Sequence, residues 1–272
     1  MSRVVDQKAN RDGFPKAGEL IEWRPQKELS LQDRRVFNLL VENAGPLVAE
    51  DVWHEIPMGK LRPPRKESNS SVADSIRQLM TTVVEFSADY LNDLPAVQST
   101  VLLSENIRTI KEDDPRSILR YKFTETLRII VVHSHYWGRL KAHILFAFSS
   151  KYSMALYEAV CLRINLNVNE QVFSVDEFRH LLDVLNTKLE RFPDFYRYAV
   201  KAAVHEVNAL SDFVVAVEPL REGGRQRGKL KGFRLSWRRK SAAEWGAVLD
   251  ELTRSKAGRR ARIAGTAGRV AF

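Results

Sequence analysis

Two short patterns in this 272-residue sequence have the composition of a phosphodiester-cleaving site. His133 and His135 follow a run of alternating apolar residues. Because residues two apart in a strand point to the same face, both imidazoles would be available to one metal ion. Further along, Tyr198 and Lys201 form a Tyr-x-x-Lys pattern, in which a tyrosine hydroxyl could attack a phosphate beside a cation. Together the patterns would support metal-assisted cleavage of a nucleic acid strand.

The two patterns resemble the metal-binding and nucleophile motifs of rolling-circle nickases, but the match is incomplete. Those enzymes place a bulky apolar residue between the histidines, where this sequence has Ser134, and no clear third ligand accompanies the pair. The sequence also lacks a Gly-x-x-x-x-Gly-Lys-Ser/Thr loop, and Cys161 lies in an apolar stretch typical of a core residue. We therefore predict no catalytic residue, no metal and no cofactor, with nicking as the less favoured alternative.

The same tyrosine and lysine also fit a non-catalytic role on a helix predicted over 193–210. The expected buried side chains of this helix are Phe195 or Tyr196, Ala199, Val200, Ala203, Val204 and Val207. The opposite face carries Asp194, Arg197, Tyr198, Lys201, His205 and Asn208. Arg197 and Lys201 are four residues apart, so they share an exposed face. Since arginine can pair bidentately with guanine, we predict that Arg197, Tyr198 and Lys201 contact DNA on a base-reading helix.

A glycine-rich basic turn follows that helix. Residues 222–229 separate two alternating runs, 213–217 and 233–237, and this arrangement predicts a β-hairpin. The cations of the hairpin, which we expect to contact phosphate, are Arg221, Arg225, Arg227, Lys229 and Lys231. The first half of the chain offers a less basic set of candidates, namely Arg77 and Gln78 on a predicted helix, with Arg65 and Lys66 before it. Phosphate contacts contribute salt-dependent and mostly sequence-independent affinity.

The net charge of +9, from 43 basic and 34 acidic side chains, is unevenly distributed. From Arg221 to the C-terminus there are 15 basic and 4 acidic residues, whereas the preceding residues carry 28 and 30. Such asymmetry indicates an anionic polymer as partner, usually nucleic acid. The single cysteine, the polar N-terminus and the lack of an apolar run of about 20 residues predict a cytoplasmic protein without a membrane partner.

The order of predicted elements repeats along the chain. In the first half, we predict helices at 30–43 and 68–83, a shorter apolar segment at 47–56 and an alternating stretch at 119–131. The second half has helices at 153–166, 174–185 and 193–210, then the hairpin. Three helices followed by a hairpin is the order of a winged helix. We therefore predict an α+β protein with two tandem winged-helix domains, at 29–145 and 146–245, between a lead-in at 1–28 and a disordered basic tail at 246–272.

Three segments carry a resemblance to a known family. They are LSLQDRR at 29–35, FSSKYSMALYE at 148–158 and VHEVNALSD at 204–212, and they resemble the iteron-binding family of plasmid replication initiators. The resemblance covers roughly residues 29–237, and its second-half motifs are the more specific. The basic tail extends past the region that resembles the family.

The resemblance implies a function that composition and spacing do not. Monomers would bind direct repeats in the origin, called iterons. Dimers formed through the first domain would bind an inverted repeat in the operator and repress the chain's own gene. Replication would be of the theta type, with a host replication initiator and helicase recruited and no strand cleavage.

A transcription regulator with two tandem winged-helix domains is the other alternative. Both kinds of protein need base contacts from a helix and anchors on phosphate, so the residues do not separate them. Two domains in one chain favour a long or repeated DNA site. Several direct repeats beside the gene, each about two helical turns long, would favour initiation, and an inverted repeat alone would favour repression.

The nicking alternative is tested with supercoiled plasmid that carries the repeats. Incubated with the protein and Mg²⁺ or Mn²⁺, this plasmid should stay supercoiled on an agarose gel. Relaxation that disappears in Tyr198→Phe would establish a tyrosine nucleophile and contradict the prediction of a non-catalytic protein.

Overall fold

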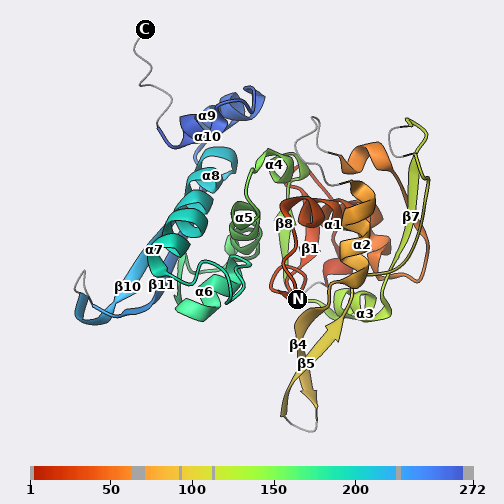
Figure 1. Cartoon of the computed structure of the whole chain (residues 1–272), viewed down its shortest axis with the longest axis horizontal. Coiled ribbons are helices and arrows are strands. Elements are labelled where there is room, and N and C mark those ends of the chain that lie inside the picture. The colour runs from red at the N-terminus through yellow and green to blue at the C-terminus, as the bar shows by residue number, and fades with distance from the viewer. Residues whose placement is uncertain (1–2, 63–70, 92–93, 112–113, 225–227, 266–272) are drawn as a thin grey trace. The chain divides into compact units, whose positions relative to one another are not determined.

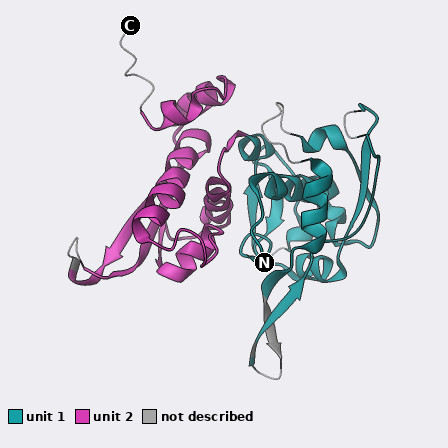
Figure 2. Cartoon of the chain, in the orientation of Figure 1, with its two compact units in different colours: residues 1–146 teal, residues 147–272 magenta. Residues whose placement is uncertain are grey.

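The computed structural model describes residues 3–62, 71–91, 94–111, 114–224 and 228–265. The chain divides into two compact units, unit 1 at 1–146 and unit 2 at 147–272 (Figure 2). The division falls one residue from the boundary between the two predicted domains. Each unit has its own buried core, and each is described here by itself.

Unit 1 combines helices with short antiparallel strands (Figure 1). Its α-helices are α1 Leu31–Ala44, α2 Val72–Thr81, α3 Glu125–His133 and α4 Ala142–Ala147. Its strands are β1 Phe14–Ala17, β2 Arg24–Pro25, β3 His54–Pro57, β4 Val84–Leu91, β5 Leu94–Thr100, β6 Leu103–Arg108, β7 Ile118–Phe123 and β8 Trp137–Leu140. The strands form three sheets, ordered β1–β8, β2–β4–β5 and β3–β7–β6. Short 3₁₀ turns lie at Val4–Asp6, Gly45–Ala49 and Met58–Leu61.

Helix α1 is the centre of unit 1, and its start follows from local sequence. The Ser30 hydroxyl accepts a hydrogen bond from the Asp33 amide at 3.1 Å, and the Asp33 carboxylate accepts one from the Ser30 amide at 2.8 Å. This capping box satisfies two backbone donors that an uncapped helix leaves without partners. Phe37 and Leu40 are then fully buried in the core. The helix ends at Gly45, whose φ of 54° is a conformation that favours glycine.

The expectation of a lead-in that precedes the first domain is wrong for the described part of residues 1–28. Strand β1 pairs with β8, with Phe14 opposite Leu140, and Trp23 is 4% exposed beside Phe37. The lead-in lacks a local apolar period because it forms a short edge strand and turns. Its stability comes from a partner strand more than 100 residues away in the sequence, which local patterns do not reveal.

The alternating stretch at 119–131 is also not one strand, which corrects the expectation that His133 and His135 follow a strand. Strand β7 ends at Phe123, and α3 begins directly after Thr124, whose hydroxyl accepts from the Leu127 amide at 3.4 Å. The buried residues of α3 are Leu127 and Val131, four apart. A spacing of four fits both an alternating strand and a helical face, so the apolar pattern alone was ambiguous. The hairpin of β4 and β5 was not predicted.

Unit 2 has the predicted helices, a three-stranded antiparallel sheet and two further helices (Figure 1). Its helical elements are α5 Lys151–Arg163, α6 Val175–Leu181, α7 Phe192–Asp194, the π-helical turn η4 Phe195–Lys201, α8 Ala202–Leu210, α9 Ala242–Thr253 and α10 Arg259–Ile263. Its strands are β9 Glu170–Ser174, β10 Phe213–Arg221 and β11 Leu230–Arg239, in the order β10–β11–β9, with a 3₁₀ turn at Glu222–Gly224. Helix α5 is buried along most of its length and includes Cys161 at 1% exposure. Within the described ranges, no helix is long and apolar enough to cross a membrane.

Helices α9 and α10 lie where the sequence predicted a disordered tail, so that expectation is wrong for residues 246–265. The predicted domain end at residue 245 falls inside α9. Ser241 and Glu244 form a capping box, and two hydrogen bonds from Arg238 on β11 reach the Glu244 carboxylate at 2.8 and 2.9 Å. The Arg238 guanidinium lowers the pKa of Glu244 to about 2. Only residues 266–272 of the predicted tail lie outside the described residues.

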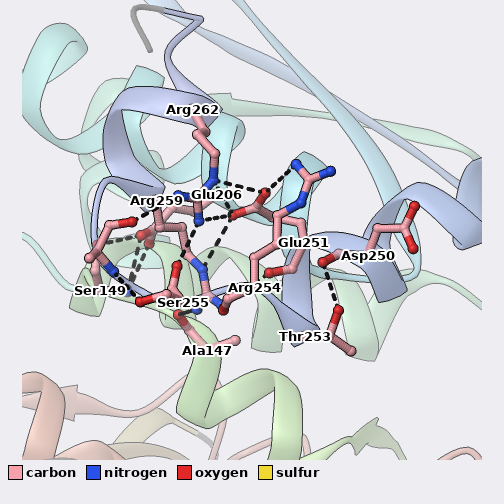
Figure 3. A network of polar contacts seen from close by, with 11 residues as sticks. Ala147, Ser149, Glu206, Asp250, Glu251, Thr253, Arg254, Ser255, Arg259 and Arg262 are labelled. Carbon is pink, nitrogen blue, oxygen red and sulfur yellow. Dashed lines mark hydrogen bonds and ion pairs between the residues drawn. The ribbon is translucent and has the colours of Figure 1, made fainter.

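One carboxylate, that of Glu251, forms ion pairs with three arginines of this C-terminal segment (Figure 3). The Glu251 side chain is 12% exposed, and its oxygens lie 2.9 Å from Arg262 Nη2, 3.5 Å from Arg259 Nε and 3.5 Å from Arg254 Nη1. The Arg262 hydrogen bond is the main reason that the pKa of Glu251 is lowered. A composition of glycine, alanine and arginine suggested solvated charges, but three of these arginines share one acid.

The same segment is attached to the beginning of unit 2. Arg259 is 5% exposed and donates from Nη1 to the Ala147 carbonyl at 3.3 Å, while Arg260 donates to the Ser149 hydroxyl at 3.0 Å. The Ser149 amide donates at 3.1 Å to the buried carboxylate of Glu206 on α8, as Figure 3 shows. Residues 246–265 are therefore part of the unit 2 fold, and protein groups hold Arg254, Arg259, Arg260 and Arg262.

We predict that Glu251→Gln lowers the free energy of unfolding of unit 2 by about 3 kcal/mol at neutral pH, because it leaves the buried Arg259 without its acid. The lowered pKa of Glu251 means that its contribution is complete above the unfolded pKa of about 4.3. The contribution is lost as the pH falls through the folded value. Denaturant titration should therefore show that wild type and variant converge in acid.

The neighbouring exposed acid provides a matched control. Asp250→Asn removes one negative charge from the same helix and should leave the free energy of unfolding almost unchanged. Equal effects of the two substitutions would contradict a specific role for Glu251.

Candidate DNA-binding surface

The predicted base-reading helix is present as one continuous helical segment. It consists of α7, the turn η4 and α8, and Pro193 lies in its first turn, where a missing amide donor is harmless. Its buried residues are Phe195, Ala199, Val200, Ala203, Glu206, Val207 and Leu210. Its exposed residues are Pro193, Arg197, Tyr198, Lys201 and His205. The predicted buried face is largely correct, although Val204 is only half-buried.

A π-helical turn shapes the exposed surface of this segment. In η4 the neighbours Ala199 and Val200 are both buried, and the neighbours Arg197 and Tyr198 are both exposed. The wider turn thus presents two consecutive side chains to solvent, and π turns often occur at functional sites. The Arg197 guanidinium lies 5.3 Å from the centre of the Tyr198 ring.

Arg197 and Lys201 keep their charges available. Within the described ranges, neither side chain forms an ion pair with an acid, and both are exposed. A guanidinium offers a fork of donors that matches a guanine edge, and an ammonium offers donors to a single acceptor or a phosphate. The geometry therefore supplies the two donor types that sequence analysis assigned to this helix.

The hairpin of β10 and β11 is present and longer than predicted. Val215 lies opposite Trp237 in the antiparallel register, and Gly223 has a φ of 64° at the turn. Two of its predicted phosphate contacts, Arg225 and Arg227, lie outside the described residues.

The other three predicted phosphate contacts of the hairpin lie within the described residues. They differ in exposure and in the contacts that they already make. Lys229 is exposed. Lys231 lies 3.3 Å from Glu222 in an exposed ion pair, an interaction that contributes little and can be exchanged for phosphate. Arg221 is half-buried, donates to the Gly228 carbonyl at 2.9 Å and lies 4.8 Å from the Phe192 ring. Arg221 therefore joins the hairpin to the start of the base-reading helix.

The residues that join the other end of this helix to the hairpin are not evident from the sequence. Asn208 was expected on the exposed face, but its side chain bonds the Val215 amide at 2.7 Å and the Val215 carbonyl at 2.9 Å. Lys240 donates to the carbonyls of Asn208 and Ser211, and burial lowers its pKa to about 8. These contacts satisfy the last carbonyls of α8. An asparagine and a serine at a helix end were the only sequence signal for them.

The candidates in unit 1 are less available than those in unit 2. Arg77 forms an exposed ion pair with Asp74 at 2.7 Å. Gln78 is half-buried, and its Oε1 atom is buried without a hydrogen-bond partner among the residues that the structure describes. Arg65 and Lys66 lie outside the described residues.

The catalytic pattern is not assembled as the sequence suggested. His133 ends helix α3 and His135 lies in the connection after it, so the two imidazoles do not share the face of a strand. In the parts of the chain that the structure describes, no group of three or more histidine, cysteine or acidic residues could hold a metal ion. Tyr198 is 53% exposed beside Arg197 on the base-reading helix.

The fold and this surface define the class of the protein. Unit 2 has α5 and α6 before the helix from α7 to α8 and a hairpin after it, which is the arrangement of a winged-helix domain. Comparison with family sequence profiles extends the assignment to both units. The profile described as "Initiator Rep protein, WH2" matches residues 174–237, and "Initiator Replication protein, WH1" matches residues 15–161.

The chain therefore belongs to the initiator Rep protein family and has two winged-helix domains, WH1 and WH2. This result confirms the predicted α+β fold and the family resemblance. The WH1 match begins at residue 15, in agreement with the structured β1 strand. The match to WH2 includes the base-reading helix and the hairpin, and it ends before α9.

One solved initiator structure has the same fold, and a second gives a weaker match. The crystal structure of the Pi initiator protein in complex with iteron DNA is similar with a TM-score of 0.56 and 15% sequence identity, and the match covers 84% of this chain and 98% of that chain. The structure of RctB domains 2–3 matches with a TM-score of 0.43 and 13% identity, over 82% of this chain and 87% of that chain. No curated protein matches the chain significantly.

Two substitutions should separate base reading from phosphate binding. Arg197→Ala should cost about 1–3 kcal/mol on the preferred DNA sequence and relax the preference at one position, because it removes the guanidinium fork. Lys229→Ala should weaken binding to all sequences alike and flatten the salt slope by about one unit. Both are measured by fluorescence anisotropy over a salt series.

Each substitution controls for the other, since both remove one exposed cation from unit 2. Unchanged sequence preference in Arg197→Ala would remove Arg197 from base reading. Selective loss on the preferred sequence in Lys229→Ala would contradict its assignment to phosphate.

Proposed function

We propose that this protein initiates plasmid replication by binding direct repeats in the origin with sequence specificity. The observation that carries the proposal is the pair of exposed cations Arg197 and Lys201, which lie on a WH2 helix beside a basic hairpin and have no acidic partner among the described residues. The Pi initiator protein, which has the same fold, is crystallised with iteron DNA. Membership of the initiator Rep protein family supports a role in starting replication, and the exposed Arg197 and Lys201 support DNA as the ligand.

The proposed binding mode divides the work between two surfaces of unit 2. The helix from α7 to α8 enters the major groove, where Arg197 and Lys201 reach base edges and Tyr198 packs beside them. The hairpin lies along the neighbouring backbone, and Lys229, Lys231 and the cations at its tip bind phosphate. Arg221 holds the hairpin at the start of the helix. In unit 1, α2 would make a second and weaker contact through Arg77 and Gln78.

A dimer of the chain would act as repressor of its own gene on an inverted repeat. The edge of unit 1 supports self-association. Strand β5 is at the edge of the β2–β4–β5 sheet, and its side chains Leu94 and Val97 are 68% and 64% exposed. An exposed apolar edge strand is a natural site for pairing between chains.

The remaining partners follow from the proposed role. As a cytoplasmic initiator of theta replication, the protein would recruit the host replication initiator and helicase and would not cleave DNA. A tandem winged-helix transcription regulator would use the same helix and hairpin. The two functions differ in the DNA that they require, since only the initiator needs several direct repeats.

We predict that the purified protein shifts a duplex carrying one repeat from its plasmid origin at much lower concentration than a shuffled duplex of equal length. Affinity should fall steeply as salt rises. Plasmids that carry all the repeats should replicate when the protein is supplied in trans, and plasmids with shuffled repeats should not.

Different results would identify the alternatives. Equal affinity for the repeat and the shuffled duplex would overturn the proposal. Specific binding confined to an inverted repeat at the promoter, without support of replication, would indicate a transcription regulator.

A further inference from the structure

The connection between α6 and the base-reading helix is irregular and held in a disfavoured conformation. Residues 182–191 form no helix or strand. Two of them, Asp183 and Leu189, have positive φ angles of 55° and 50° although neither is a glycine. Such angles persist only where surrounding contacts hold them. The contacts on this connection therefore determine where the next helix begins.

Arg179, in the last turn of α6, donates three side-chain hydrogen bonds to this connection. The side chain is 7% exposed and donates from Nη1 to the Leu189 carbonyl at 3.1 Å and from Nη2 to the Leu185 carbonyl at 3.0 Å. Nη2 also donates to the Lys188 carbonyl. One planar guanidinium thus binds three carbonyls of the connection, a geometry that a lysine ammonium cannot reproduce.

The partners of Arg179 are unusual for a buried cation. Among the described residues, the guanidinium contacts carbonyls and an aromatic ring but no carboxylate. A buried charge without an acid is costly unless hydrogen bonds compensate for the lost water. Arg179 is therefore poorly explained as a surface charge or as half of an ion pair. Its contacts are those of a side chain that fixes backbone.

The same guanidinium reaches the base-reading helix. It lies 4.9 Å from the centre of the Phe195 ring, and Phe195 is 1% exposed and packs against Phe233 of β11. Phe195 is the first residue of η4, and Arg197 and Tyr198 follow it within the same turn. Arg179 therefore touches both the connection and the residue from which the DNA-facing side chains project.

A second cation holds the beginning of the connection. Lys151 of α5 donates to the Asp183 carbonyl at 3.2 Å and lies 4.0 Å from the Asp183 carboxylate. Asp183 is buried, so the chain leaves α6 in a fixed direction. Arg179 then holds the later residues 185–189. The two contacts together leave the path into α7 little freedom.

We propose that Arg179 is a positioning residue for sequence recognition, which sets the direction of Arg197 and Tyr198 without touching DNA. The inference rests on the proposed function, since it assumes that this helix reads bases. Hydrogen bonds to base edges tolerate displacements of only a fraction of an ångström, whereas phosphate attraction tolerates much more. Loss of Arg179 should therefore reduce discrimination between sequences and leave non-specific affinity intact.

The test compares Arg179→Lys and Phe195→Leu with the control Arg191→Ala. Arg179→Lys keeps the positive charge but loses the planar guanidinium that binds three carbonyls. Phe195→Leu removes the aromatic ring that contacts the Arg179 guanidinium. Arg191 lies on the same connection, but its side chain is 82% exposed and, among the described residues, forms an ion pair with Asp194 alone. The probe is a duplex selected by the wild-type protein from a random pool, measured against a shuffled duplex over a salt series.

We expect the ratio of selected to shuffled affinity to fall at least about tenfold in both test variants, the size of one lost base contact. The salt slope should stay at the wild-type value, because no phosphate contact is removed. Amide hydrogen exchange over residues 195–201 should quicken in Arg179→Lys. Arg191→Ala should retain the ratio and the exchange rates.

Three results would overturn the inference. One is a ratio of selected to shuffled affinity that stays at the wild-type value in Arg179→Lys and Phe195→Leu, when both variants are folded. Another is a salt slope lowered by about one unit in Arg179→Lys, which would place the side chain on phosphate. The third is failure of both variants to fold, since Arg179 would then serve the whole domain. A wild-type protein that selects no sequence would instead refute the proposed function.

Discussion

A cation on a protein surface binds DNA more readily when no acid of the same chain already neutralises it. The organisation of unit 2 follows from this constraint. Arg254, Arg259 and Arg262 all form ion pairs with Glu251, and Arg238 forms one with Glu244. Arg197 and Lys201 are exposed and have no such acid among the described residues. These four arginines therefore have a structural role, and the charges proposed to read bases lie before them in the sequence.

Free cations are useful for recognition only on a rigid support, and polar contacts add to the apolar packing of this helix. Asn208 joins α8 to β10, Arg221 joins the hairpin to Phe192, and Arg179 holds the preceding connection. The Asn208 and Arg179 contacts satisfy backbone groups that would otherwise lack partners. The helix is thus fixed at its start, at its end and beside the hairpin. Arg197, Tyr198 and Lys201 on its outer face stay exposed to solvent.

Local chemistry made much of this predictable, and distant partners explain the failures. The predicted helices at 30–43 and 174–185 do begin at these positions, where Ser30 and Ser174 form capping boxes whose hydrogen bonds lie within three residues. Strand β1 was missed because its partner β8 is far away in sequence. The stretch after Thr124 was misread because a spacing of four fits two structures. The exposure of Arg197 was predictable from the helical period, but the role of Arg179 depends on an irregular connection that has no period.

We propose above all that the helix from α7 to α8 reads bases while the hairpin holds the backbone. A crystal structure of the protein on a duplex that carries one origin repeat would show both contacts. We expect this helix in the major groove, with the Arg197 guanidinium within hydrogen-bond distance of a base edge and Lys229 beside a phosphate. A complex in which this helix faces solvent, or in which Arg197 contacts no base, would contradict it.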